Sequence, residues 1–430
     1  MSHRSPGRKR IARLAVPLVS AAALALGAAP ASASTDTPGA APASKIQHIV
    51  ILMQENRSFD DYFGRLHFEG QNATDPEPRG TNNPNPVNSD APPIKAFHQT
   101  SFCEVADLNH SWTGVHQEID GGLMDGFTAA NVDPADPLGA RAMGFYDSAD
   151  LPFYYGLYST FAIGDRFFAS VPGPTFPNRE YLLAGTSFGH IQNDLPAAGL
   201  PGPSIFNELD AAGITWKDYF SDLPSSFLFA YPRLHAAGHL APIAAYYADA
   251  AAGTLPQVAF VDPKFTGTNN TETDEHPPVN IQVGQRFVSG VVQALFASPA
   301  WSSSALFLTY DEHGGYYDQV APPAAVAPDD IAPMLGPGDV QAGFDMYGVR
   351  APAVVVSPFS RAHFVSHIVH DHTSILRFVE LRFGLPALTR RDAAADPMLE
   401  LFDFSTASFA TAPSLPAATI DPTKAAACGA

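Results

Sequence analysis

The chain has 430 residues, of which 46% are hydrophobic, and a formal net charge of −19 at pH 7. A surface this acidic disfavours charge-driven binding to nucleic acid and to anionic membranes, so we expect no nucleic-acid partner. The length suits two or three average domains, or one large α/β domain with insertions.

The first 33 residues have the pattern of an export signal. A basic head contains Arg4 and Arg8, residues 11–29 are apolar, and small residues lead up to Ala33. We therefore expect a secreted protein whose signal is cleaved near Ala33. No later segment reaches the roughly 18 apolar residues that a bilayer span needs, so we expect no integral membrane association.

Cys103 and Cys428 are the only cysteines, and their wide separation argues against a thiolate metal site. In an oxidising compartment they can form one disulfide that pins the tail to an early loop. Two free thiols are the alternative, and the sequence leaves both open.

Residues 46–53 are an apolar run that predicts a strand, and it is followed at once by Glu55 and Asn56. Ser58, with Asp61 three residues later, resembles a helix-opening cap. Residues 71–96 are rich in Pro, Asn and Asp and predict a long loop. His110 and His116 come next, six residues apart, and such a pair is usually structural or exposed.

A turn stiffened by three prolines at residues 171–177 separates a predicted helix (151–160) and strand (161–168) from a further helix. Thr175 would lie just before that further helix, where backbone N–H groups and the helix dipole favour a phosphate. An ordinary N-cap threonine is the alternative.

The rest of the chain also alternates between helix and strand patterns. We expect helices at 204–212 and 281–296, strands at 215–219, 256–261, 305–310 and 349–356, and a helix that is capped by Asp371 and Ser374 and runs through Leu381. Residues 406–430 predict a loosely ordered tail. This alternation predicts an α/β fold, with a doubly wound, mostly parallel sheet sandwiched by helices and long loop insertions.

Residues 305–310 read as a buried strand, and two acids stand directly at its carboxyl end. Asp311 and Glu312 would repel one another unless a cation lay between them. Gly314 and Gly315 follow and make the turn flexible. A solvated turn is the alternative, but the sequence favours half of a hard-cation site.

Five blocks of sequence together resemble one family. They are residues 54–64, 109–112, 174–179, 310–318 and 371–374. They are similar to the bacterial phosphoesterases that include phospholipase C and a related acid phosphatase, within the alkaline-phosphatase-like superfamily. The resemblance implies an alkaline-phosphatase-like catalytic domain over residues 45–405.

The resemblance also implies roles for particular residues. It implies a metal held by oxygen ligands and touched by the threonine nucleophile, with the ligand set Glu55, Asn56, Thr175, Asp311 and Glu312. The resemblance implies catalytic roles for Thr175, His110 and His276. It implies contacts to the substrate for Asn56, Asn178 and Arg179.

The chain is therefore expected to be a secreted, metal-dependent phosphoric ester hydrolase that works through a phospho-threonine. Oxygen ligands suit Ca²⁺, Mg²⁺ or Mn²⁺, and the nearby histidines keep Zn²⁺ open. Phospholipases C of this kind carry additional β-sandwich domains after the catalytic one, whereas this sequence ends at residue 430. Phospholipids and soluble phosphomonoesters thus both stay open as substrates.

Two other functions compete with this one. Ser187, within Gly185 to Gly189, matches the nucleophile motif of α/β-hydrolase serine esterases, but a helix-like segment precedes it where a strand is required. A catalytically silent binding protein would have no need of both acid clusters and Thr175. Metal-dependent phosphatase activity would separate all three.

Overall fold

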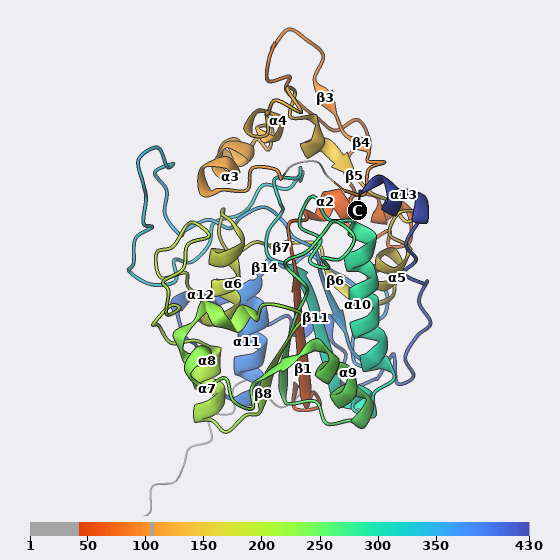
Figure 1. Cartoon of the computed structure of the whole chain (residues 1–430), viewed down its shortest axis with the longest axis vertical. Helices are drawn as coiled ribbons and strands as arrows, with labels where there is room; N and C mark the ends of the chain where they lie inside the picture. The colour runs from red at the N-terminus through yellow and green to blue at the C-terminus, as the bar shows by residue number, and fades with distance from the viewer. Residues whose placement is uncertain (1–42, 104–106, 430) are drawn as a thin grey trace, which may run out of the picture. The chain divides into compact units, whose positions relative to one another are not determined.

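A central eight-stranded sheet organises the computed structural model, which describes residues 43–103 and 107–429 (Figure 1). The predicted export signal at 1–33 lies outside these residues. The strand order is β13-β6-β12-β11-β1-β10-β8-β9. The strands are β1 (His48–Gln54), β6 (Ala162–Gly164), β8 (Trp216–Phe220), β9 (Leu240–Pro242), β10 (Val258–Asp262), β11 (Ser304–Tyr310), β12 (Ala353–Val356) and β13 (Val365–Ser366).

Most of the sheet is parallel, as expected. β1 is paired in parallel with β10 on one side and β11 on the other, and β8 and β9 continue the parallel part. β12 runs antiparallel to both of its neighbours, β11 and β6. It begins directly after Pro352, which lacks the N–H that a central strand would use.

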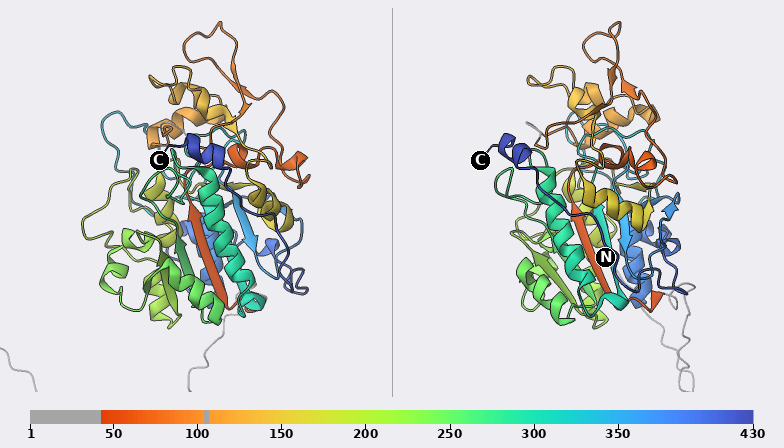
Figure 2. Two further views of the ribbon diagram at one scale, coloured as in Figure 1. Left: turned by 45° about the vertical axis from the view of Figure 1, so that its right-hand side comes forward. Right: turned by 90° about the vertical axis from the view of Figure 1, so that its right-hand side faces the viewer.

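Helices cover both faces of the sheet, so the doubly wound arrangement is confirmed (Figures 1 and 2). One face carries α5 (Pro152–Thr160), α9 (Ile243–Ala252) and α10 (Ile281–Phe296). The other carries α6 (Thr175–Ala184), α7 (Ile205–Ala211), α8 (Ala230–Leu234) and α11 (His372–Phe383). Residues 49–53 of β1 are buried between the two layers.

Shorter elements lie in the insertions. The helices are α2 (Phe59–Phe63), α3 (Trp112–Ile119), α4 (Phe127–Ala130), α12 (Arg390–Ala394) and α13 (Pro422–Ala427). The strands are β2 (Asn82–Asn83), β3 (Ile94–Lys95), β4 (Phe97–His98), β5 (Gly144–Phe145), β7 (Phe167–Phe168) and β14 (His370–Asp371). Among the described residues, no helix combines the length and apolar character that crossing a bilayer requires.

The predicted caps are present. The Ser58 hydroxyl accepts a hydrogen bond from the Asp61 N–H at 3.0 Å, and Asp371 and Ser374 form a capping box at the start of α11. The predicted strand at 161–168 is wrong as a single element, because it divides into β6 and β7, which belong to different sheets. The division falls at Asp165, a buried carboxylate that accepts hydrogen bonds from other segments instead of continuing the strand.

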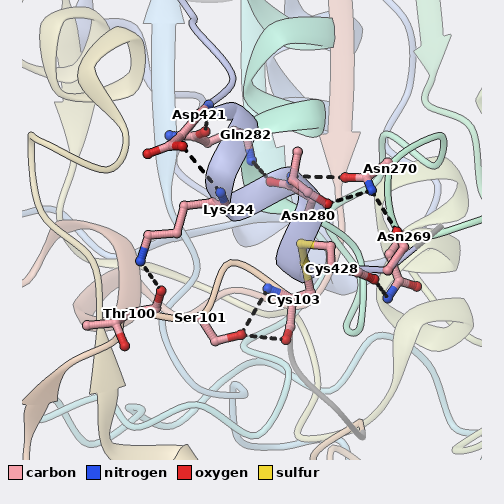
Figure 3. The surroundings of a disulfide bond; sticks show 12 residues. Thr100, Ser101, Cys103, Asn269, Asn270, Asn280, Gln282, Asp421, Lys424 and Cys428 are labelled. Atoms are coloured by element: carbon pink, nitrogen blue, oxygen red, sulfur yellow. Dashed lines mark hydrogen bonds between the residues drawn. A yellow bond between two sulfur atoms is a disulfide. The ribbon is translucent and has the colours of Figure 1, made fainter.

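The C-terminal tail is not loosely ordered over residues 421–429, and here the expectation is wrong. Cys103 and Cys428 form a disulfide, with 5.5 Å between their Cα atoms (Figure 3). Asp421 caps α13, and the side chains of Asn269 and Asn270 donate to carbonyls of its last turn. The tail composition alone shows neither the pairing nor these contacts.

Candidate active site

The carboxyl ends of three neighbouring parallel strands meet at one edge of the sheet. In the register of β1 and β11, Gln54 lies opposite Tyr310, and β10 flanks β1 on its other side. Each strand leads into an acid: Glu55 after β1, Asp262 at the end of β10 and Asp311 after β11. Open α/β sheets bind ligands at this edge.

Hydrogen bonds join the β1 and β11 ends closely. The backbone N–H groups of Asn56 and Glu312 both donate to Asp311 Oδ1, at 3.1 and 2.7 Å. Gly314 (φ 66°) passes so close to Asn56 that an added Cβ would lie 2.4 Å from its carbonyl oxygen. Only glycine satisfies both the positive φ and the close approach.

Three buried side-chain oxygens at this junction accept no hydrogen bond from any residue that the structure describes. They are Asn56 Oδ1, Asp311 Oδ2 and Glu312 Oε1. Buried acceptors ordinarily have a partner. Two carboxylate oxygens and an amide oxygen are a donor set that hard divalent cations prefer, so the residues present fit the expected metal.

The pKa shifts of Asp311 and Glu312 are consistent with a cation at this junction. Burial, with the nearby charges of Glu55 and Glu312, raises the pKa of Asp311 well above its ordinary value. Burial alone would also raise the pKa of Glu312, but His110 and His313 outweigh it and the pKa is lowered. A bound cation would favour the ionised form of both carboxyls.

Arg179, on α6, ties that helix to the strand ends. Its Nη2 donates to Glu55 Oε1 at 3.0 Å and to the Met53 carbonyl at 3.2 Å. Its Nε lies 3.7 Å from Asp311 Oδ2, and Nη1 lies 4.0 Å from Asp262 Oδ1. The guanidinium thus balances the acids of all three strand ends.

Thr175 is the first residue of α6 and not, as expected, the residue just before the helix, because Pro174 occupies the N-cap position. The alternative of an ordinary N-cap threonine is therefore wrong. The side chain is largely buried yet lines a cavity of about 540 Å³ together with Glu55, Arg179 and His276. The structure thus brings together four of the residues singled out from the sequence.

Asn178 lies outside that cavity. Its Oδ1 accepts from the Val171 N–H at 3.1 Å, and its Nδ2 donates to the carbonyls of Val171, Gly173 and Pro174. All of its hydrogen-bonding capacity holds the proline-stiffened turn in shape. The Asn178 side chain therefore holds the turn that leads into Thr175, and its contact to the substrate stays a prediction.

His110 and His276 lie together, with ring centroids 5.9 Å apart. Asp107 lies beside both, 3.7 Å from His110 Nδ1 and 3.6 Å from His276 Nε2. These three side chains offer atoms close enough together for a metal. Burial lowers the pKa of His110, but the charges of Glu312 and Asp107 outweigh it and the pKa is raised. Sequence reasoning did not single out Asp107, although its place three residues before His110 was a usable signal.

The cavity lining is mixed. Its apolar residues include Phe176, Leu195, Leu223, Phe227 and Phe265. Its acids include Glu272 and Asp274, and burial together with the charge of Glu55 raises the pKa of Asp274 to about 9. Sequence reasoning also missed Asp274 as a site residue, because its loop shows no regular pattern.

Ser187 does not have the setting of an esterase nucleophile. It follows α6 rather than a strand, it is fully buried, and its hydroxyl donates to the His190 carbonyl at 2.7 Å. The strand-to-helix elbow that the esterase motif requires is absent at this position.

Comparison with known proteins agrees with the geometry. The sequence model described as "Phosphoesterase family" matches residues 46–386, which include all five motif blocks. The chain belongs to this phosphoesterase family. It is a phospholipase C-like hydrolase that acts on phosphoric ester bonds.

Two curated relatives of this phosphoesterase are phospholipases. Non-specific phospholipase C1 of Arabidopsis thaliana is 32% identical over 386 residues, covering 83% of this chain and 71% of that protein. Phospholipase C B of Mycobacterium tuberculosis is 32% identical over 419 residues, covering 84% and 78%. A solved structure from Vibrio parahaemolyticus, titled as a protein in the alkaline phosphatase superfamily, matches with a TM-score of 0.41 and 9% identity over 82% of this chain and 69% of that one.

Proposed function

We propose that this phosphoesterase cleaves its substrate through a phospho-Thr175 intermediate, with a divalent cation held by Glu55, Asn56, Asp311 and Glu312. The observation that carries the proposal is the position of Thr175. Thr175 is the first residue of α6, and it lines a cavity together with Glu55 and Arg179. The three buried oxygens of Asn56, Asp311 and Glu312 that accept no hydrogen bond from the described residues support the choice of a cation here.

The reaction follows from the chemistry of phosphoryl transfer. When bound, the cation supplies charge stabilisation to phosphoryl oxygens and lowers the pKa of a neighbouring hydroxyl. The Thr175 hydroxyl releases its proton to solvent as its oxygen attacks phosphorus in line, the bond to the leaving oxygen breaks, and that oxygen takes up a proton. His276, which lines the cavity, is suited to give this proton, with Asp107 beside it. Water then hydrolyses the phospho-threonine and releases the phosphate product.

Substrate binding would use both the helix start and Arg179. The positive end of the α6 dipole favours an anion at the helix start, and the Arg179 Nε–H donates no hydrogen bond to any described residue. We propose a phospholipid as the substrate, because the two curated relatives bear phospholipase names and the cavity lining includes apolar side chains. Hydrolysis of phosphatidylcholine, compared with nitrophenyl phosphate and nitrophenyl phosphorylcholine, tests this choice.

We also propose that the chain is exported. The support is the signal pattern at residues 1–33 together with the Cys103–Cys428 disulfide, which suits an oxidising compartment. Sequencing the N-terminus of the protein recovered from culture medium tests this, and a protein that stays inside the cell with residues 1–33 intact contradicts it.

The decisive experiment on the mechanism replaces Thr175. Thr175→Ala should lower turnover by about 10³-fold or more, because covalent catalysis loses its attacking group. Thr175→Ser keeps a hydroxyl and should retain part of the activity. Thr186→Ala is a matched control, since Thr186 is also buried but follows the other end of α6.

Trapping with labelled substrate at low pH, followed by peptide mapping, should find phosphate on residue 175. Chelation should abolish turnover, and adding back Ca²⁺, Mg²⁺, Mn²⁺ or Zn²⁺ singly should identify the cation. A Thr175→Ala protein that turns over at the wild-type rate would mean that water attacks directly.

A further inference from the structure

Glu275 is a buried carboxylate that the proposed chemistry does not use. It has no exposed surface, and it stands between Asp274 and His276, which both line the cavity. Its own side chain turns away from the cavity lining and is held by side chains from three other elements.

Three donors hold the Glu275 carboxylate. The Tyr154 hydroxyl from α5 and the Gln54 amide donate to Oε1, the latter at 3.1 Å, and the Tyr310 hydroxyl donates to Oε2 at 2.9 Å. Gln54 is the last residue of β1, and Tyr310 is the last residue of β11. One carboxylate thus connects the residues that immediately precede the two acid clusters.

The backbone around Glu275 is docked on the same strand end. The Glu55 N–H donates to the Asp274 carbonyl at 2.9 Å, and Arg57 Nη2 donates to the Glu275 carbonyl at 2.8 Å. Gln54 Nε2 also donates to the Thr273 carbonyl at 2.8 Å. These hydrogen bonds attach the loop that carries His276 to residues 54–57, so a shift of those residues would move the loop.

Glu275 holds an unusual backbone conformation, with φ at 75°. A residue other than glycine in this region is strained and persists only where its surroundings hold it. Gly284 on α10 leaves the space for its side chain, since an added Cβ there would lie 2.1 Å from Glu275 Cγ. The hydrogen bonds that hold Glu275 in this strained conformation are thus the same ones that connect it to the ends of β1 and β11.

We propose that Glu275 is a positioning residue that sets the His276 loop against the ends of β1 and β11. This inference rests on the proposed function, because it assumes that His276 and the residues at those strand ends serve the same reaction. Charge-assisted hydrogen bonds from three elements fix one geometry more firmly than neutral bonds would. Loss of any donor should let the loop shift relative to Glu55 and Asp311.

Two tyrosines on α5 provide a matched test. Tyr154 donates to Glu275, whereas the Tyr158 hydroxyl, one turn later and equally buried, has no hydrogen-bond partner among the described residues. Tyr154→Phe should lower kcat by roughly 10- to 100-fold, the scale of a small misplacement of catalytic groups. Tyr158→Phe should leave kcat unchanged. Equal kcat in both variants and the wild type would overturn the proposal.

A double-mutant cycle shows whether Glu275 acts through the His276 loop. Glu275→Gln keeps the shape of the side chain but removes its charge, and it should cost less kcat in a His276→Ala background than in the wild type. Full additivity of the two losses would overturn a role through His276. Gly284→Ala, which leaves every titratable group in place, should lower kcat by displacing Glu275, and wild-type kcat there would count against the proposal.

Thr175→Ala is assayed beside these variants to separate two kinds of failure. If Thr175→Ala is inactive and Tyr154→Phe behaves like the wild type, the proposed function stands and the role of Glu275 is overturned. If Thr175→Ala keeps wild-type activity, the proposed mechanism fails, and the tyrosine comparison still decides whether Glu275 positions the loop.

Discussion

Arg179 is the only guanidinium that contacts all three acids at the strand ends in the part of the chain that the structure describes, and replacing it tests the cation site without an activity assay. Arg179→Met keeps much of the apolar stem and leaves Glu55, Asp262 and Asp311 without their shared positive partner. Breaking a buried ion pair by removing one partner costs about 3–5 kcal/mol. We expect a loss of this size in the free energy of unfolding when no divalent cation is present.

A divalent cation should restore a large part of that loss. In the wild type, a ligand at 100 times its Kd adds about 2.7 kcal/mol of stability. In Arg179→Met the gain should be larger, because no guanidinium competes for Glu55 and Asp311. The assay is urea unfolding of both proteins, with and without a chelator.

Arg350→Met provides the matched control. Arg350 is also fully buried and pairs with two acids, Asp60 at 2.9 Å and Asp318 at 2.8 Å, but it does not contact the three strand-end acids. Arg350→Met should lose a similar amount of unfolding free energy. The stability that a divalent cation adds to this variant should equal the stability that it adds to the wild type. If the cation stabilises Arg179→Met no more than the wild type, the acids at the strand ends do not bind it.

Two further predictions concern stability. Reduction of the Cys103–Cys428 disulfide should lower the free energy of unfolding by about 2–4 kcal/mol, and titration of two free thiols in the unfolded, unreduced protein would contradict the pairing. Burial lowers the pKa of His372 to about 4 in the folded protein, so the unfolded chain takes up its proton first as the pH falls from about 6.5. Stability should therefore decrease towards pH 4 by up to about 1.4 kcal/mol per pH unit, and denaturation curves of His372→Gln should show a weaker pH dependence than the wild type.

The sequence predicted best those elements that depend on local patterns of apolar and polar residues. The apolar runs at 46–53 and 305–310 correspond to β1 and β11, and the acids that follow them are brought together because parallel strands end at one edge. The helix at 281–296 was predicted with the bounds that the structure gives it. The roles of Thr175, His110 and His276 came from resemblance, and they stay predictions.

What the sequence could not show depends on contacts between distant segments. Glu275 sits in an irregular loop, and its partners Tyr154 and Tyr310 are far away in the chain, so no spacing could have revealed it. The resemblance implied a substrate contact for Asn178, which stays a prediction, and only the fold shows that its amide holds the turn. The sequence left the pairing of Cys103 with Cys428 open for the same reason, because the disulfide joins two distant segments.

The pairing of β1 also bears on the order of events during folding. Both of its neighbours, β10 and β11, come much later in the chain, so the segment from residue 55 to residue 257 must be made before either can pair. Until then residues 49–53, all apolar, lack both of their sheet partners, and an apolar strand with open edges is a template for aggregation. The catalytic edge, which needs Glu55 and Asp311 together, is assembled only after β11 has joined the sheet.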